Sequence, residues 1–252
     1  MSSIKKIYRI LPIQIRNKVR NLYYLKKFKS ISWQDEKDLD LLKLFIKPDA
    51  IIMDIGANYG LYTRFMAELT GPKGQVYSFE PIPTMYHVLK NNVSKLKLTQ
   101  VQIITMAVSN KTGKATMQVP TYKDGSENFY EASLKHTDGN SGISVETIRL
   151  DDKFEHIPSL DFIKIDIEGH EPEALEGAKN TITKHRPVML IEINDGFAID
   201  SIGRKVKEQM QEWGYTMYYY DGKNILPSSC KEEGVNYIFL TPEHLKNLQK
   251  SN

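Results

Sequence analysis

Short apolar segments alternate with longer amphipathic ones from residue 48 onward, and this alternation limits the possible folds more than any other feature. Short runs rich in Val, Ile, Leu and Phe are typical of buried strands, and the segments between them have helical spacing. Repeated strand–helix–strand units build a mostly parallel sheet with helices on both faces, so we expect an α/β fold. The expected strands are 49–54, 75–79, 101–107, 160–167, 188–193, 215–220 and 236–240, and the expected helices are 61–69, 84–96, 173–183 and 201–213.

Two regions depart from the alternation. Between about 110 and 150, strands at 114–119 and 145–150 flank a polar loop, which predicts an inserted hairpin. The last two strands follow one another without a helix, so we expect an antiparallel pair at one edge of the sheet. The loop at 120–142 is expected to shape a substrate pocket, with four side chains able to touch a ring: Tyr122, Phe129, Tyr130 and His136.

Residues 1–30 form a basic arm ahead of a single domain at 31–252. The arm holds nine Lys or Arg residues and no acid, although the whole chain has a net charge of only +3. Its apolar residues predict an amphipathic helix after Pro12: Ile15, Val19, Leu22, Tyr23 and Phe28. Two interpretations stay open. The helix either packs on the body or docks on an anionic membrane, at about 1 kcal/mol for each basic residue near the surface.

The composition excludes several classes of protein. No apolar run approaches the length of about 18 residues that a membrane-spanning helix needs. The single cysteine, Cys230, excludes an intrachain disulfide framework and a cysteine-rich zinc site. The arm also lacks the unbroken apolar core of a secretory signal. We therefore expect a cytoplasmic protein, either free or peripheral on the inner membrane face.

A glycine-rich turn follows the first strand, where parallel sheets bind their ligands. It has the pattern D-x-G-x-x-x-G, formed by Asp54, Gly56 and Gly60, and not the G-x-G-x-x-G of a dinucleotide site. An acid there disfavours a pyrophosphate and favours a positively charged ligand such as S-adenosylmethionine. Glu80 ends the second strand, 24 residues past Gly56, where an acid accepts hydrogen bonds from ribose hydroxyls.

Polar residues also crowd the ends of two later strands. Asp166 ends the strand at 160–167 and is expected to face the cleft, with His170 and Glu171 at the start of the next helix. Glu192 and Asn194 share one face at the end of the neighbouring strand. Asp166, Glu192 and Asn194 together predict an oxygen-rich site for a cation such as Mg²⁺. The same three residues could instead orient a sugar hydroxyl.

Five strings, in this order, closely resemble the FkbM-family S-adenosylmethionine-dependent methyltransferases: DIGANYGLYT, FEPIP, AVSN, LDFIKIDIEGHEPEALEGA and EIN. The resemblance covers roughly residues 50–195. It implies a Rossmann-like methyltransferase sandwich, with a seven-stranded, mostly parallel sheet whose last strand is antiparallel. It also implies O-methylation of sugars or small molecules. The residues that it assigns to the methyl donor are Asp54, Gly56, Asn58, Tyr59, Gly60, Glu80, Pro81, Ala107, Val108, Ser109 and Asp166.

The chemistry of methyl transfer calls for a base, because a hydroxyl is a poor nucleophile until it loses its proton. His170 is our first choice for this base, because its ordinary pKa lies near neutrality. Asp166 is the second, and Glu171 is a further catalytic candidate.

We expect a sugar O-methyltransferase that acts on a glycan or a glycan precursor. The alternatives are an O-methyltransferase of a small metabolite or natural product, and an inactive, donor-binding partner subunit. A nicotinamide-dependent dehydrogenase is disfavoured by the missing fingerprint. No nucleic-acid partner is expected, because the chain beyond the arm is net acidic.

Overall fold

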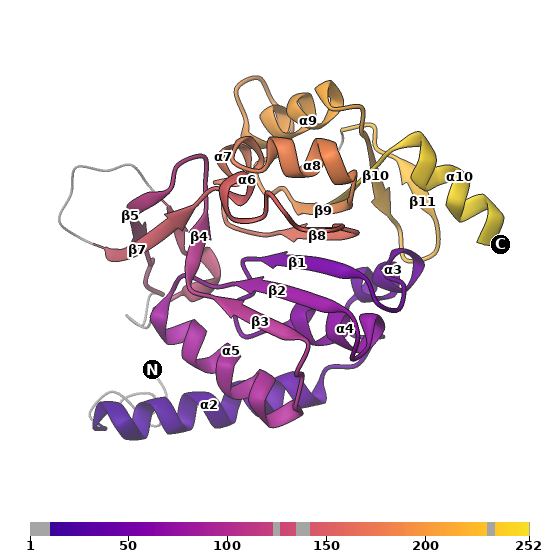
Figure 1. Cartoon of the computed structure of the whole chain (residues 1–252). Helices are drawn as coiled ribbons and strands as arrows, with labels where there is room; N and C mark the ends of the chain where they lie inside the picture. Colours follow the sequence, from indigo (N-terminus) through magenta and orange to yellow (C-terminus); the bar gives the residue numbers. More distant parts are fainter. Residues whose placement is uncertain (1–10, 123–126, 135–141, 231–234, 252) are drawn as a thin grey trace.

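A computed structural model describes residues 11–122, 127–134, 142–230 and 235–251 (Figure 1). Its main sheet has eight strands in the order β11-β10-β12-β9-β8-β1-β2-β3. The five strands from β9 to β3 pair in parallel, which confirms the predicted α/β fold. The strand bounds are β1 Ile51–Ile55, β2 Gln75–Phe79, β3 Val101–Ile104, β8 Phe162–Ile165, β9 Val188–Glu192, β10 Thr216–Tyr220, β11 Ile225–Pro227 and β12 Asn236–Leu240.

The far end of this sheet differs from the prediction in two ways. β12 runs antiparallel to both of its neighbours and lies between β9 and β10, so the last pair of predicted strands is antiparallel but β12 is not at the edge. The short strand β11, which the sequence did not indicate, pairs with the outer side of β10. It raises the strand count from the expected seven to eight.

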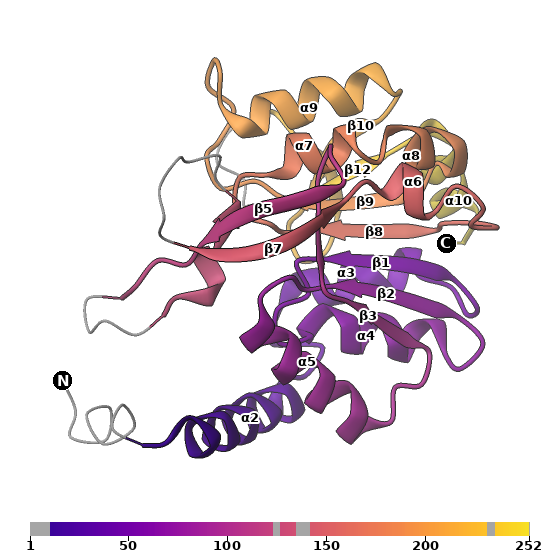
Figure 2. The same ribbon diagram turned by 60° about the vertical axis from the view of Figure 1, so that its left-hand side comes forward.

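The predicted strand at 101–107 is two strands that belong to different sheets. β3 ends at Ile104 in the main sheet, and the chain then enters a second sheet of four strands in the order β4-β7-β5-β6. The predicted hairpin lies in this second sheet, where β5 and β7 run antiparallel side by side (Figure 2). Its strands are β4 Met106–Val108, β5 Gly113–Gln118, β6 Ser133–Leu134 and β7 Ile143–Ile148. Parts of the predicted loop, including His136, lie outside the described residues.

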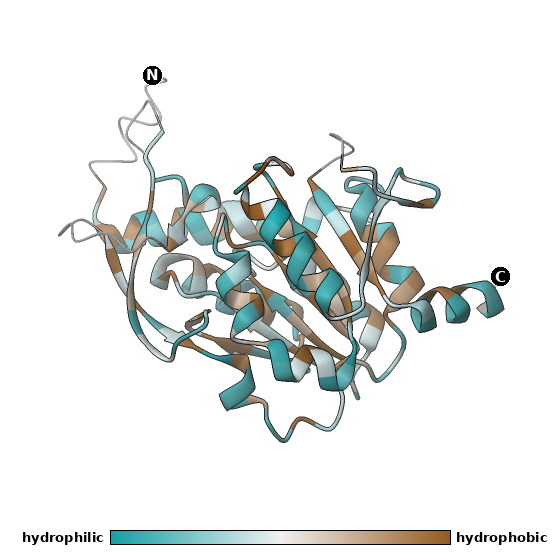
Figure 3. Ribbon diagram, turned by 90° about the horizontal axis from the view of Figure 1, so that it is seen from above, coloured by the Kyte–Doolittle hydropathy of each residue, from teal (hydrophilic) through white to brown (hydrophobic). Residues whose placement is uncertain are grey.

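Helices cover both faces of the main sheet, because successive strand residues point to opposite sides. Ile52 and Phe162 pack in the cluster that includes α3 (Lys37–Phe45) and α4 (Leu61–Thr70). Met53 and Ile163 pack in the cluster that includes α7 (Glu171–Glu176), α8 (Lys179–His185) and α9 (Ile202–Glu212). The central strands are accordingly mostly hydrophobic and the outer helices carry hydrophilic residues (Figure 3). The helices are α2 Ile13–Ser30, α3 Lys37–Phe45, α4 Leu61–Thr70, α5 Pro83–Leu96, α6 Leu150–Lys153, α7 Glu171–Glu176, α8 Lys179–His185, α9 Ile202–Glu212, α10 Pro242–Ser251 and the 3₁₀ turn η1 Phe129–Glu131.

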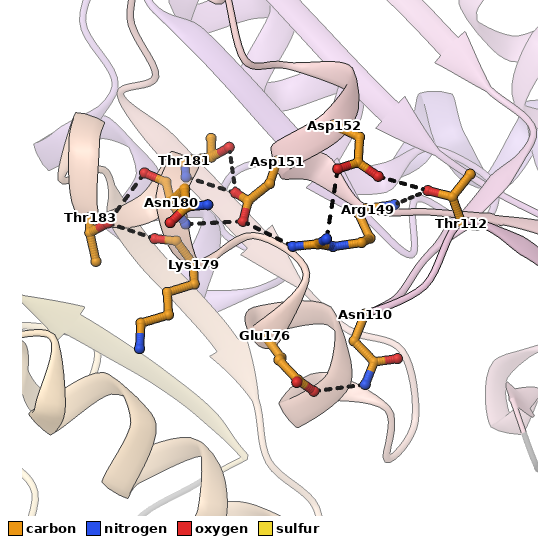
Figure 4. A network of polar contacts seen from close by, with 10 residues as sticks. All are labelled: Asn110, Thr112, Arg149, Asp151, Asp152, Glu176, Lys179, Asn180, Thr181 and Thr183. Carbon is orange, nitrogen blue, oxygen red and sulfur yellow. Dashed lines mark hydrogen bonds and ion pairs between the residues drawn. The ribbon is translucent and has the colours of Figure 1, made fainter.

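The predicted helix at 173–183 is interrupted at Gly177, between α7 and α8. A side chain at Gly177 would collide with the carbonyl oxygen of Ser109, so the chain comes too close to its neighbour there for any other residue. Asp151 on α6 binds the first turn of α8 after this interruption. Its Oδ1 accepts hydrogen bonds from the backbone N–H and the hydroxyl of Thr181 at 2.8 and 3.0 Å (Figure 4). These contacts connect α6, which follows strand β7 of the second sheet, to α8 beside the main sheet.

Helix α2 packs against α5 at the β3 end of the molecule (Figures 1 and 2). Tyr24 and Phe28 are its buried side chains, and the Arg64 guanidinium donates to the backbone carbonyls of Phe28 and Ile31 at 2.5 and 3.1 Å. Phe28 therefore points toward the body. Its spacing predicted a face shared with four side chains that are instead exposed: Ile15, Val19, Leu22 and Tyr23. Among the described helices, none combines the length and apolar character needed to cross a bilayer.

Candidate functional site

A cavity of about 360 Å³ opens at the carboxyl ends of β1, β2, β8 and β9. The loops after these strands form its floor, and α2 and the segment around η1 contribute its walls. Parallel sheets bind ligands at this edge, so the cavity is the candidate active site. Its lining residues are Lys27, Glu36, Asp54, Gly56, Ala57, Asn58, Tyr59, Leu61, Tyr62, Glu80, Pro81, Ile82, Met117, Phe129, Tyr130, Ala132, Lys164, Asp166, Ile167, Glu168 and Glu192.

Asp54 lies near the end of β1 and is almost fully buried. One of its carboxylate oxygens accepts a hydrogen bond from the Thr63 hydroxyl at 2.5 Å, whereas Oδ1 has no hydrogen-bond partner in the described structure. Burial raises the pKa of the Asp54 carboxyl, and the nearby Lys164 ammonium partly offsets this rise. A buried acceptor without a partner is costly, so this carboxylate is suited to a positively charged ligand group.

Glu80 holds the loop after β1 in shape. Its two carboxylate oxygens accept the backbone N–H groups of Asn58 and Ile82, each at 2.9 Å. Asn58 has a φ of 50°, and its side chain accepts the N–H of Tyr59 at 2.8 Å. Burial raises the pKa of Glu80 to about 7, against the effect of the two N–H donors. Two lone-pair directions on each oxygen leave Glu80 able to accept a further hydroxyl.

The first and last glycines of this loop are required by its packing. Gly56 has a φ of 85°, and a side chain there would collide with the carbonyl oxygen of Asp166. Gly60 has a φ of 96° and precedes α4, and an added Cβ would lie 2.6 Å from a methyl carbon of Leu89. Both glycines therefore let the loop approach its neighbours while its backbone lines the cavity.

A lysine and two carboxyl groups form the charged centre of the cavity. The Lys164 ammonium lies 2.8 Å from Asp166 Oδ2 and 4.5 Å from the centre of the Tyr62 ring. Burial by itself raises the pKa of Asp166, but the Lys164 charge and hydrogen bonds from Glu192 and Lys164 outweigh it and bring the pKa below its usual value. Burial and the charge of Asp166 raise the pKa of Glu192 to about 8. Near neutral pH, Glu192 is therefore protonated and donates to Asp166.

His170 and Glu171 lie behind the wall of the cavity. The His170 ring is buried, with Nε2 2.9 Å from the Ser109 hydroxyl and Nδ1 3.6 Å from Glu173. Glu171 Oε1 accepts the backbone N–H groups of Ile167 and Gly169 at 3.3 and 3.1 Å, and burial raises its pKa to about 7. Neither side chain lines the main cavity, whereas Asp166, the third predicted catalytic residue, does.

His170 instead lines a small apolar cavity of about 20 Å³. Ala107 and Val108 also line it, and four residues line both cavities: Gly56, Pro81, Met117 and Ile167. The predicted donor residues at 107 and 108 therefore lie beside the main cavity and not within it. Ser109 reaches this region through its hydrogen bond to His170.

The three residues of the predicted cation site are only partly brought together. Asp166 and Glu192 are hydrogen-bonded in the main cavity, but Asn194 is exposed and directs its amide nitrogen toward Glu168 at 3.4 Å. Among the described residues, no three His, Cys, Asp or Glu side chains are arranged to hold a metal ion. The structure therefore gives the predicted Mg²⁺ site no support.

Several lining residues did not appear among the predicted site residues. Lys164 precedes Asp166 in the motif by two positions, so the alternation of strand side chains could have indicated that it shares the Asp166 face. Lys27 carried no such signal, because it lies on a helix outside the strand–helix pattern. Phe129 and Tyr130 line the cavity, as their place in the inserted loop suggested, whereas Tyr122 does not.

The sequence of this chain also matches a known protein family. The model of the methyltransferase FkbM domain matches residues 54–217, which is well over half of the chain and includes the loops after β1, β2, β8 and β9. The chain belongs to the FkbM methyltransferase domain family. The resemblance seen in the motifs is thereby confirmed. Helix α2 lies outside the matched part of this FkbM domain.

Two curated relatives of this chain are named as methyltransferases, one of oxygen at a 2-position and one of a hexuronic acid. The 2-O-methyltransferase NoeI of Sinorhizobium fredii is 31% identical over 160 residues, covering 58% of this chain and 64% of that protein. The hexuronic acid methyltransferase AglP of Haloferax volcanii is 26% identical over 163 residues, covering 62% of each chain. The chain thus spans just under two thirds of the length of these relatives. Among solved structures, the methyltransferase FkbM from Methylobacillus flagellatus KT is 16% identical, with a TM-score of 0.49 over 93% of this chain and 57% of that one.

Proposed function

We propose that this protein is an S-adenosylmethionine-dependent O-methyltransferase that acts on a sugar hydroxyl of a glycan or glycan precursor. The observation that carries the proposal is the acidic cavity at the carboxyl ends of the strands, which Asp54, Glu80 and Asp166 help to line. S-adenosylmethionine carries a sulfonium and an ammonium, which this charge favours. The names of the two relatives support a sugar as the acceptor and oxygen as the methylated atom.

Each part of the donor has matching residues in this proposal. Asp54 attracts the positively charged end, and Glu80 accepts the ribose hydroxyls. The backbone from Gly56 to Gly60, with Asn58 and Tyr59, lines the space between them. The adenine ring is assigned to the side of the main cavity at Pro81, because the adjoining cavity of about 20 Å³ is too small for it. Ala107 and Val108 lie next to this side, and Ser109 helps to hold its wall through His170.

In this proposal, the hydrogen-bonded carboxyl groups of Asp166 and Glu192 activate the acceptor by taking the proton of its hydroxyl group. The donor, when bound, supplies a methyl group from its sulfonium sulfur. The sulfur–methyl bond breaks, and the rest of the donor leaves as a neutral thioether. The new bond forms between this methyl carbon and the sugar oxygen, and the oxygen's proton passes to the pair. We choose the pair over His170 because both carboxyl groups line the main cavity, whereas the His170 ring does not. His170 then acts as a positioning residue through Ser109.

The first test combines purified protein with methyl-labelled S-adenosylmethionine and saccharides extracted from cells lacking this gene. We expect label on one sugar, and loss of the corresponding methyl from that sugar in the mutant cells, measured by mass spectrometry. Asp54→Asn serves as the variant with impaired donor binding. Donor binding without any labelled saccharide would instead favour a small-metabolite acceptor or a donor-binding, inactive partner subunit.

The proposed base is tested through the pH dependence of kcat/KM. The pair is a stronger base once Glu192 is ionised as well as Asp166, so kcat/KM should rise with pH and level off above about 8. Glu192→Gln should remove this step and lower turnover at least about tenfold. The competing result concerns His170→Ala. If this variant loses the rise of kcat/KM with pH and shows an equal fall in turnover, with donor affinity intact, then His170 is the base.

We also propose that α2 docks the protein on an anionic membrane surface, which would bring the cavity to lipid-linked saccharides. In the described structure, five of the ten exposed large apolar side chains lie on this one helix. Ile15, Val19, Leu22 and Tyr23 share the face opposite Phe28, and six Lys or Arg residues and no acid accompany them on α2. Exposed apolar side chains flanked by bases match an anionic lipid interface.

The membrane proposal is tested by sedimentation with vesicles containing phosphatidylglycerol. The double variant Val19→Asp, Leu22→Asp should lose most of its vesicle binding. Ile199→Asp is the matched control, because Ile199 is 81% exposed but lies in the loop before α9. Equal binding by both variants, or binding independent of the anionic lipid, would exclude α2 as a membrane-docking element.

A further inference from the structure

Helix α2 contributes one charged side chain, Lys27, to the wall of the main cavity. We propose that Lys27 is the residue that binds a carboxylate in this cavity. The inference rests on the proposed function, because two ligands of that reaction can carry such a group. One is the methyl donor, through its amino-acid end, and the other is an acidic sugar acceptor.

The balance of charge in the cavity supports this assignment. Two lysines line it, together with six acids: Glu36, Asp54, Glu80, Asp166, Glu168 and Glu192. Lys164 is already paired with Asp166 at 2.8 Å. Within the described residues, Lys27 forms no ion pair, so it is the uncompensated positive charge of the lining. A carboxylate entering the cavity is repelled by the floor and attracted to the α2 wall.

The residues around Lys27 hold its ammonium group in place and leave some of its N–H hydrogen-bond donors available. Its Nζ lies 3.2 Å from the Tyr130 hydroxyl, 5.0 Å from the centre of the Tyr59 ring and 5.4 Å from that of Tyr130. An ammonium has three N–H donors, and the Tyr130 hydroxyl takes one of them. Two donors therefore remain for a carboxylate, at a place defined by two aromatic rings.

The helix beneath Lys27 is held firmly enough to make this placement useful. The next residue, Phe28, is fully buried, and its carbonyl accepts a hydrogen bond from Arg64. Tyr24, one turn earlier, packs against the Tyr59 ring with 5.2 Å between ring centres. A cation on an anchored helix loses less freedom on binding than one on a free arm. The arm of the sequence is thus part of the active site.

The test compares Lys27→Gln with Lys26→Gln, a matched control whose side chain is exposed on the neighbouring helix position. Three affinities are measured by calorimetry: that for S-adenosylhomocysteine, and those for glucuronic acid and glucose in the presence of S-adenosylhomocysteine. If Lys27 binds the donor, Lys27→Gln weakens S-adenosylhomocysteine binding at least about tenfold. If it binds the acceptor, that affinity is unchanged and the preference for glucuronic acid over glucose is lost.

Lys27→Arg, which keeps the positive charge, should restore most of the lost affinity, and this distinguishes carboxylate binding from a packing role of the side chain. Equal behaviour of Lys27→Gln and the wild type toward both ligands overturns the proposal, including the case in which neither binds. These measurements need no methyl transfer. A protein that binds as expected but transfers no methyl group would therefore contradict the proposed function and leave the role of Lys27 standing.

Discussion

At the scale of single residues, Gly56 shows how the candidate site depends on a missing side chain. Its φ of 85° is unfavourable for other residues, and its Cα faces the carbonyl of Asp166 on the adjacent strand end. Asp166 is drawn to this position because its backbone N–H donates to Ile55 at 3.0 Å. The two chain segments that carry the donor loop and the proposed base therefore touch directly at Gly56.

Gly56→Ala should consequently be far more destabilising than an alanine at an uncrowded glycine. Positive φ alone costs about 1–2 kcal/mol for a residue with a Cβ. Gly222 has a φ of 100° and nothing within 4 Å of an added Cβ, so Gly222→Ala isolates this cost. Thermal unfolding should show a fall in Tm at least about twice as large for Gly56→Ala. Equal falls would mean that the loop moves away without penalty.

At the scale of elements, α2 is a helix that depends on its packing. It has no side-chain N-cap and no acid in its first turn, and its six basic residues repel one another. Its favourable features are Lys27 and Lys29 in the last turn, near the negative end of the helix dipole. An isolated helix of this kind is marginal in water, so Tyr24, Phe28 and Arg64 decide whether it forms.

Phe28→Ala should therefore release α2. Truncating a buried Phe costs about 3–5 kcal/mol, and the basic residues of the freed helix become sites for trypsin. Leu22→Ala is the control, because Leu22 is 67% exposed and such changes alter stability by about 0.5 kcal/mol or less. Limited proteolysis should cut Phe28→Ala within 13–30 much faster than the control. Equal cleavage rates would show that α2 does not rely on Phe28.

At the scale of the whole molecule, buried carboxyl groups make stability depend on pH. Burial raises the pKa of Glu80 and Glu171 to about 7 and that of Glu192 to about 8. In the unfolded chain these groups titrate near 4.5, so between the two values the folded protein holds more protons than the unfolded one. Their contribution to stability is complete below the unfolded pKa and is lost as pH rises through 7 to 8.

The free protein should accordingly have a lower Tm at pH 8.5 than at pH 6.5. One kcal/mol corresponds to about 2–4 °C for a protein of this size, so a fall of several degrees is expected. Calorimetric or fluorescence melting over this range measures it. Glu192→Gln, which cannot ionise, should reduce the dependence. A Tm that rises with pH over the same interval would contradict the assignment of raised pKa values to these groups.

Local patterns in the sequence were sufficient to predict much of the fold and most of the polar residues of the cavity floor. Hydrophobic periodicity is a property of neighbouring residues, so it located the strands and helices of the α/β alternation. Carboxyl ends of parallel strands meet at one edge, so the strand pattern alone groups Asp54, Glu80, Asp166 and Glu192. The motifs then led to the FkbM methyltransferase family, which the match at 54–217 bears out.

Tertiary structure alone decided which polar residues reach the cavity and how the ends of the sheet are built. His170 and Glu171 belong to a motif that predicted a site, yet packing places both behind the cavity wall. Lys27 lines the cavity from a helix that is far away in the sequence. Likewise, β12 inserts beside β9, and β4 leaves the main sheet, because strand partners are chosen by long-range burial and hydrogen bonding. Side-chain direction and long-range pairing depend on contacts between distant segments, and no local pattern encodes them.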